Sequence, residues 1–250
     1  MPELLMFQLV APIGAFGAVA VGERRETAPR PSHSGLIGLL GASLGLERAD
    51  PRQPQFSASL AFASRRDRLG PLLADYHTAQ TPPARKGRTW ATRREELSGE
   101  VNTILSRRDY HADCAFSIAC LPIEETVASL HEIAEALRRP MMTLYLGRKS
   151  CPLCLPPDPL LVQAKTLRGA FDAYDAFRED RQPERVRWRD PDGEVSLSAV
   201  FHAHGLAPPP GVTSGRREQR RDVVVDRRGW RFDLREEIVL PRLDTEWSGS

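Results

Sequence analysis

The sequence predicts an α+β protein built on a small sheet with helices packed against it. Four short segments in the first 150 residues are typical of strands, and two longer segments are typical of helices. Their order is strand–helix–strand–strand–helix–strand. This is the ferredoxin-like (RRM-like) arrangement that RNA-recognition modules share, and we expect it over residues 1–150 as a palm.

The first strand and the first helix are marked by clear boundary residues. Apolar residues alternate from residue 5 to residue 9, and we expect this strand to end at Pro12. Ser34 can cap a helix over residues 35–44, which Gly45 ends. The helix carries glycines three or four residues apart, on one face, where its backbone can approach a sheet or another chain closely: Gly35, Gly38, Gly41 and Gly45.

The second half of the palm supplies three strands and one helix. We expect the strands over residues 59–65, 114–121 and 143–146. An amphipathic helix over residues 124–138 lies between the last two, and Pro140 ends it.

The character of the chain changes at the proline-rich stretch that begins near Cys151, and we expect a smaller, β-rich region over residues 151–250. This region begins with a helix over residues 160–177, followed by short strands, a hairpin turn at residues 190–193 and a loop at residues 208–211. Residues 216–235 carry eight arginines against four acids and predict a basic two-stranded element. This element can be either a solvent-exposed face or a surface that contacts RNA or protein.

An insertion over residues 75–109 separates the second and third strands. A connection this long in a compact domain is usually either functional or disordered. Its cations are interleaved with aromatic residues, which favours an arm that contacts nucleic acid over a mobile surface loop. The residues concerned are Tyr76, His77, Arg85, Lys86, Arg88, Trp90, Arg93, Arg94, Arg107 and Arg108.

The composition excludes several classes of protein. The formal net charge of +2 does not indicate a general polycation, and no apolar run is long enough to span a membrane. The four cysteines without a secretory signal indicate reduced thiols and a cytoplasmic location. Cys151 and Cys154 have C-x-x-C spacing but no partner motif, so we interpret them as structural. Acidic residues are scattered, so we expect no metal and no organic cofactor.

The most informative segment is Tyr145-Leu-Gly-Arg-Lys-Ser-Cys-Pro-Leu153, at the end of a predicted strand. It places an aromatic ring, a glycine, two adjacent cations and a hydroxyl together. Two neighbouring cations are rarely buried, so a core role is disfavoured. A single-stranded nucleic acid needs a stacking surface and positive charge, which this segment offers. A solvated turn is the alternative interpretation.

Several segments together resemble the five-type subunits of the subtype I-E Cascade complexes of CRISPR immunity. They lie in the same order as in that family: Leu9-Val-Ala-Pro12 with Phe16-Gly17, the stretch from Pro31-Ser-His-Ser-Gly35 to Arg48, Asp75-Tyr-His-Thr78, Arg108-Asp-Tyr110 before Asp113, and Tyr145 to Leu153. Family chains usually have Trp-Gly in place of Phe16-Gly17 and an arginine in place of His33. Arg30 can compensate for the second difference.

The resemblance implies a palm with a projecting thumb, which we place at the 75–109 insertion. It implies a subunit that caps one end of the complex and grips the 5′ repeat-derived handle of the CRISPR guide RNA. The implied partners are the backbone subunit CasC, the large subunit CasA and, through the complex, target DNA, with no membrane. The expected RNA-binding residues are Arg30, Ser34, Gly35, Arg48, Tyr76, His77, Arg88, Arg93, Arg107, Arg108, Tyr145, Arg148, Lys149 and Ser150.

Two other functions stay open at this point. One is a metal-independent endoribonuclease that processes precursor RNA, because a five-type subunit of a related subtype cuts RNA itself. Tyr76, His77, His111 and Lys149 can supply acid–base chemistry for it, with either His77 or His111 acting together with Lys149. The resemblance to subtype I-E assigns cutting to a separate subunit, CasE, so we expect a non-catalytic protein. The other alternative is a structural cap with little RNA contact.

Overall fold

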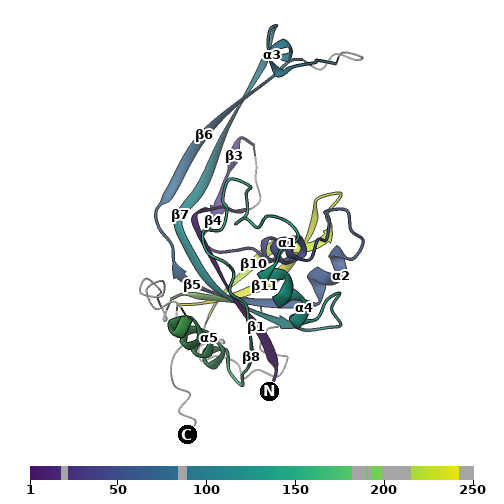
Figure 1. The fold of residues 1–250 in the computed structure, drawn as a ribbon. Coiled ribbons are helices and arrows are strands. Elements are labelled where there is room, and N and C mark those ends of the chain that lie inside the picture. Colours follow the sequence, from purple (N-terminus) through teal and green to yellow (C-terminus); the bar gives the residue numbers. More distant parts are fainter. Residues whose placement is uncertain (18–21, 84–88, 182–189, 191–192, 199–214, 242–250) are drawn as a thin grey trace.

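The computed structural model describes residues 1–17, 22–83, 89–181, 190, 193–198 and 215–241. Figure 1 shows a body formed by one sheet with helices on both of its faces, and a long two-stranded arm that projects from the body. The class is α+β and strands dominate it, as the sequence predicts.

Four neighbouring antiparallel strands form one side of the sheet, in the spatial order β5-β7-β1-β8, with β8 at the edge. Two helices, α1 and α2, connect β1 to β5, and α4 lies between β7 and β8. The bounds of these elements are β1 Glu3–Gly14, α1 His33–Ser43, α2 Gln53–Ala58, β5 Leu60–Arg68, β7 Asn102–Pro122, α4 Leu130–Arg138 and β8 Leu160–Gln163.

The C-terminal strands extend the same sheet beyond β5. β9 (Val195–Ser198) pairs with β5 and with β11 (Arg231–Leu240), and β11 forms a hairpin with β10 (Arg216–Asp226). Strands from both sides of residue 150 therefore share one sheet. The division into two domains at residue 150 stays a prediction.

The arm is the hairpin of β6 (Leu72–Thr81) and the first part of β7, with the short helix α3 (Arg93–Glu96) near its tip (Figure 1). β3 (Arg24–Arg25) adds in parallel to β7 where the arm leaves the body. A separate two-stranded ladder joins β2 (Phe16–Gly17) to β4 (Thr27–Ala28). The residues expected to form a thumb thus belong to this arm, except for Arg85, Lys86 and Arg88, which lie outside the described residues.

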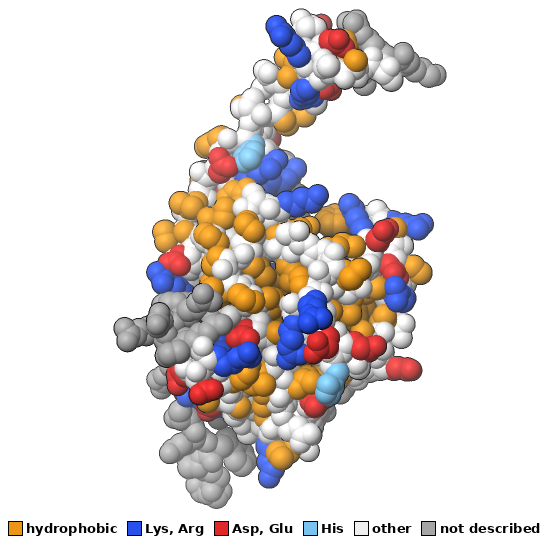
Figure 2. Space-filling model, viewed as in Figure 1, with side chains coloured by type: hydrophobic (Ala, Val, Ile, Leu, Met, Phe, Trp, Pro, Cys, Tyr) orange, Lys and Arg blue, Asp and Glu red, His pale blue; other side chains and the backbone are white. Residues whose placement is uncertain are grey.

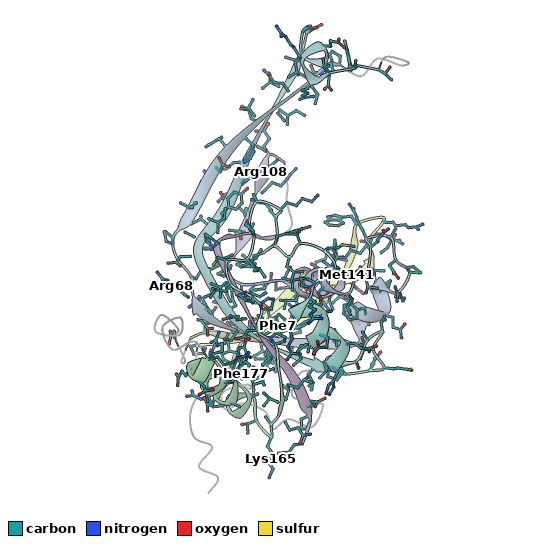
Figure 3. All side chains as sticks on the ribbon, in the orientation of Figure 1. Phe7, Arg68, Arg108, Met141, Lys165 and Phe177 are labelled. Carbon is teal, nitrogen blue, oxygen red and sulfur yellow. The ribbon has the colours of Figure 1, made fainter. Side chains whose placement is uncertain are left out.

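Apolar side chains cover both faces of the sheet. On one face, Leu5, Phe7 and Leu9 of β1 pack with α1, α2 and α4. On the other face, Leu4 and Met6 pack under α5 (Leu167–Arg181), which lies across the sheet. Burial on both sides explains why the start of β1 is almost continuously apolar, and Figure 3 places Phe7 in the centre of the body.

Three helices begin at residues other than those that the sequence predicts. Ser32, not Ser34, is the N-cap of α1, and its hydroxyl accepts a hydrogen bond from the Gly35 amide at 3.1 Å. α4 begins at Leu130 and not at residue 124, because Ser129 and Glu132 form a reciprocal capping box. The predicted helix over residues 160–177 is wrong at its start, since residues 160–163 form β8 on the edge of the sheet.

One predicted strand end and one predicted strand also need correction. β1 does not stop at Pro12, because the ladder keeps its register on both sides of that residue, from Ala11 with Cys114 to Ile13 with Ala112. Residues 143–146 do not form a strand; Tyr145 makes a single bridge to Pro152. The chain reverses there instead, and β8 takes the position beside β1. None of the described helices is long and apolar enough to cross a membrane.

Candidate nucleic-acid interface

A groove of about 760 Å³ separates the turn at residues 145–148 from the β10–β11 hairpin. Its floor is the loop that leads into α1, together with residues 15–17. Five arginines but only two carboxylates belong to its described lining, namely Arg30, Arg148, Arg220, Arg221 and Arg227 against Glu218 and Asp222. The groove brings five expected residues together: Arg30, Ser34, Gly35, Tyr145 and Arg148.

The turn at residues 145–148 is fixed against Ala15. Gly147 has φ of +90°, and a Cβ at this position would lie 1.6 Å from the Ala15 carbonyl oxygen. The Ala15 amide donates to the Leu146 carbonyl at 3.0 Å, and the Leu146 amide donates to the Cys151 carbonyl at 2.7 Å. Only glycine fits this backbone without strain or overlap, so the sequence Leu-Gly-Arg builds one rigid edge of the groove.

Arg148 is bound to the base of the arm. Its guanidinium donates to the Asp109 carbonyl at 3.1 Å and to the Arg25 carbonyl at 3.0 Å, and it lies over the Tyr110 ring at 4.6 Å from the centroid. The Arg148 guanidinium is therefore held by the protein itself and does not reach outward as a free cation. Lys149 and Ser150 are exposed beside it, as expected.

Arg30 is occupied by carboxylates of the protein itself. It is 5% exposed and bridges Glu237, at 2.7 Å, and Glu218. Burial alone would lower the pKa of Arg30, but the charge of Glu237 and then that of Glu218 offset it, so the pKa is raised. A phosphate would have to displace these partners, and we leave Arg30 out of the interface proposed below.

Cations gather where the arm meets the body, as the blue side chains in Figure 2 show. Buried Asp109 accepts hydrogen bonds from Arg24, at 3.0 Å, and from Arg107, at 3.3 Å. Arg108 follows on the other face of β7, opposite Asp75 in the ladder and beside β3, where Figure 3 labels it. The base of the arm thus carries a cluster of arginines, two of which are held by the buried Asp109.

The remaining expected residues are spread along the arm and the hairpin. Tyr76 is 71% exposed on β6. Arg93 donates to Glu96 and to the Gln80 carbonyl, both at 2.5 Å, near the tip. Arg48 lies at the hairpin, over the Trp230 ring, and donates to the Arg227 carbonyl at 3.1 Å. No described contact joins Tyr76, Arg93 or Arg48 to the turn at residues 145–148.

The histidines proposed for RNA cleavage do not form one site. His77 bonds Asp75 at 2.5 Å and lies opposite Ser106, whereas His111 lies opposite Leu72. Their positions on the ladder differ by five residues, so they lie on opposite faces and about 16 Å apart along the arm. Among the described residues, no group of three His, Cys, Asp or Glu side chains is placed to hold a metal ion.

The sequence reasoning missed the part that the β10–β11 hairpin plays in the groove. Four residues of the hairpin line the groove although they lie far from the Tyr145 segment in the chain: Arg221, Arg227, Trp230 and Phe232. The arginine-rich composition of the hairpin left a contact surface and a solvated face both open, and nothing in its local pattern indicated which segment it would face.

Comparisons with known proteins agree on one family. A family model described as CRISPR-associated protein (Cas_Cas5) matches residues 4–236. The Escherichia coli (strain K12) protein named CRISPR system Cascade subunit CasD is 36% identical over 159 residues, which cover 62% of this chain and 70% of that protein.

Two solved structures resemble the whole chain. One, titled CRISPR RNA-guided surveillance complex, superposes with a TM-score of 0.60 at 25% identity and covers 96% of this chain and 90% of its own. Another, titled Crystal structure of Cas protein, gives a TM-score of 0.58 at 25% identity, with coverages of 96% and 95%. These matches confirm the resemblance drawn from the sequence motifs: the chain belongs to the Cas5 family of CRISPR-associated proteins.

Proposed function

We propose that this protein is a non-catalytic RNA-binding subunit of a subtype I-E Cascade complex, in which it holds the 5′ repeat-derived handle of the guide RNA. The observation that carries the proposal is the groove, whose described lining has an excess of arginines over carboxylates and includes aromatic rings on both sides. The names of the relative and of the structural neighbour, a Cascade subunit and an RNA-guided surveillance complex, support the same assignment.

The proposed handle lies in the groove, along the 145–150 turn, and continues from there towards the base of the arm. Tyr145 offers a ring for stacking, and Lys149 and Ser150 offer exposed donors for phosphate or sugar oxygens. Arg108 adds charge on the adjoining part of the arm. Contacts with phosphate would fix the register of the guide, and stacking with base-edge contacts would select the repeat sequence.

The strand order β5-β7-β1-β8 supports a ferredoxin-like palm. All three pairings are antiparallel, and helices lie between β1 and β5 and between β7 and β8. We propose that the arm is the thumb of this palm and that it contacts the guide RNA or the backbone subunit CasC. A large subunit equivalent to CasA, target DNA bound through the complex, and a cytoplasmic location complete the proposal.

The proposal is tested by equilibrium binding of the purified protein to a labelled RNA that carries the repeat handle. A scrambled RNA of equal length is the control. We expect tighter binding to the handle than to the scrambled RNA. Equal affinity for both would contradict a handle-specific site, and no binding at all would contradict the proposed function itself.

The name of the relative, a Cascade subunit, does not favour the nuclease alternative, which has its own test. Repeat RNA is incubated with the protein, with and without a chelator, and the products are separated on a gel. We expect intact RNA in both, and His77→Ala and His111→Ala should leave production of guide RNA unchanged in cells that contain CasE. Metal-independent cleavage that either substitution abolishes would establish the enzyme instead.

A further inference from the structure

The tip of the β10–β11 hairpin has features that its own fold does not require. It is the turn at residues 227–230, and it forms the wall of the groove that faces Tyr145 and Arg148. Asp226 organises this turn by accepting the Arg228 amide at 2.9 Å. The same carboxylate holds the Arg231 side chain at 3.4 Å. The turn is therefore ordered before any ligand arrives.

Arg227 is a cation without a carboxylate partner among the described residues. One of its terminal nitrogens donates to the Ser34 carbonyl at 2.7 Å, while its Nε is buried and has no hydrogen-bond acceptor in the described structure. Burial, and then the charge of Arg48, lower the pKa of Arg227. A partly buried arginine without a carboxylate partner is stabilised by an anion close to its guanidinium.

The glycine-bearing face of α1 accommodates this arginine. A Cβ added to Gly38 would lie 3.0 Å from an Arg227 terminal nitrogen, so a larger residue would push the guanidinium away from the helix. The glycine spacing seen in the sequence thus has a structural consequence at this position. The absence of a side chain at Gly38 allows the Arg227 guanidinium to lie against α1, near Ser34 and Gly38, inside the groove.

The Trp230 side chain is exposed, and its backbone conformation is strained. Its φ is +56°, in the left-handed region that non-glycine residues rarely adopt, and the side chain is mostly accessible. The Arg48 guanidinium lies 4.4 Å from its ring centroid, and the Phe232 ring packs edge-on at 5.3 Å. A large ring that is strained, exposed and oriented by two neighbours is typical of a stacking surface.

The charge of the groove favours an anionic occupant. Its two carboxylates are already paired, Glu218 with Arg30 and Asp222 with Arg235 at 2.7 Å. Arg227 and Arg221 have no ion pair among the described residues, although Arg221 donates to the Phe232 carbonyl at 3.2 Å. The carboxylates therefore do not cancel the charge of the hairpin side of the groove.

We propose that the hairpin tip is the second wall of the RNA site, where Trp230 stacks on a base of single-stranded RNA and Arg227 contacts a neighbouring phosphate. A base and its phosphate match the ring and the free cation that the tip presents. This inference rests on the proposed function, because the RNA is taken to be the guide handle that the opposite wall contacts.

Two variants of the full chain test the inference against a matched control. Arg227→Gln and Arg228→Gln remove the same charge from adjacent residues of one turn, but only Arg227 lines the groove. Trp230→Asn removes the ring with a residue that tolerates a positive φ, so the turn should keep or gain stability. Thermal unfolding of each variant checks that the hairpin is intact.

We expect Trp230→Asn to bind handle RNA about tenfold more weakly than the unsubstituted protein. Arg227→Gln should also weaken binding, and the slope of log affinity against log salt should become less steep by about 0.7, the effect of one lost phosphate contact. Arg228→Gln should leave that slope closer to its original value.

The possible failures are distinguishable. If the unsubstituted protein does not bind handle RNA, the proposed function fails. If it binds and both Trp230→Asn and Arg227→Gln bind equally well, only the role of the hairpin fails. Normal RNA binding combined with loss of assembly with neighbouring subunits would show that the tip contacts protein, which also overturns the inference.

Discussion

The guanidinium of Arg148 lies over the ring of Tyr110, 4.6 Å from its centroid. Tyr110 belongs to the part of β7 from which the arm leaves the body, and Arg148 belongs to the turn that edges the groove. The same guanidinium also bonds the carbonyls of Asp109 and Arg25. A single side chain therefore couples the groove edge to the base of the arm.

This coupling predicts that Arg148→Lys weakens both stability and RNA binding. Lysine keeps the charge but cannot donate to two carbonyls in a fixed fork while it stacks on a ring. We expect a loss of about 1 kcal/mol in the free energy of unfolding and weaker binding of handle RNA. Chemical unfolding and equilibrium binding measure the two effects.

Lys149→Arg is the matched control for that change, since Lys149 is exposed in the same turn. We expect its free energy of unfolding and its affinity for handle RNA to stay close to those of the unsubstituted protein. If Arg148→Lys behaves like this control, Arg148 does not hold the arm, and the coupling is absent.

Gly147 is predicted to be essential for the groove edge. Gly147→Ala places a Cβ against the Ala15 carbonyl and forces a positive φ on alanine, so we expect a loss of about 3 kcal/mol or more in the free energy of unfolding. Gly99→Ala is the control, because nothing lies within 4 Å of a Cβ there. Equal unfolding midpoints for the two variants would contradict the placement of the turn.

The protein is predicted to lose stability in mild acid through His33. Burial, and then the charge of Arg235, lower the pKa of this histidine to about 4, while its Nε2 lies 2.9 Å from the Ser57 carbonyl. An unfolded chain takes up the proton near pH 6.5, so acid favours unfolding as the pH falls from about 6.5 towards 4. The full effect is at most roughly 3 kcal/mol.

Denaturant titrations at several pH values between 7 and 4.5 measure this dependence. His33→Gln removes the titrating ring, so its free energy of unfolding should fall less with acid than that of the unsubstituted protein. His131→Gln, at an exposed position, should not change the dependence. Parallel curves for all three proteins would show that His33 does not contribute.

The arm is predicted to contribute to assembly more than to stability. Thr81 and Asn102 lie opposite each other in the ladder, so an Asn-Gly turn can join them in place of residues 82–101. The neighbouring strand residues are largely exposed, and we expect the unfolding temperature to change little. Assembly on guide RNA should be impaired, as size-exclusion chromatography of the reconstituted complex can measure. Normal assembly would contradict the proposed role of the thumb.

Local patterns in the sequence predicted the elements that have strong boundary signals. The apolar run of β1, the apolar face of α4 and the glycine of the Tyr145 segment each have a local cause, and each lies close to where it was expected. Residues 143–146 and 160–163 were misassigned, because short apolar runs do not reveal which of them occupies a sheet edge. That choice depends on tertiary packing.

The candidate site was only partly predictable for a related reason. The Tyr145 segment and the start of α1 were recognisable as polar and glycine-rich features at the ends of elements. The partners of Arg30 and Arg148 could not be recognised in this way, because Glu237 and Tyr110 come from strands far away in the chain. An arginine has the same local signature whether it faces a ligand or a carboxylate of its own protein.

The salt dependence of handle binding tests the central claim most directly. Affinity for the 5′ handle RNA is measured over a series of salt concentrations, with the scrambled RNA as the control. For three or more phosphate contacts, log affinity should fall against log salt with a slope of about −2 or steeper, and the handle should stay the preferred RNA throughout. A flat salt response, or the same affinity for the scrambled RNA, would contradict the account.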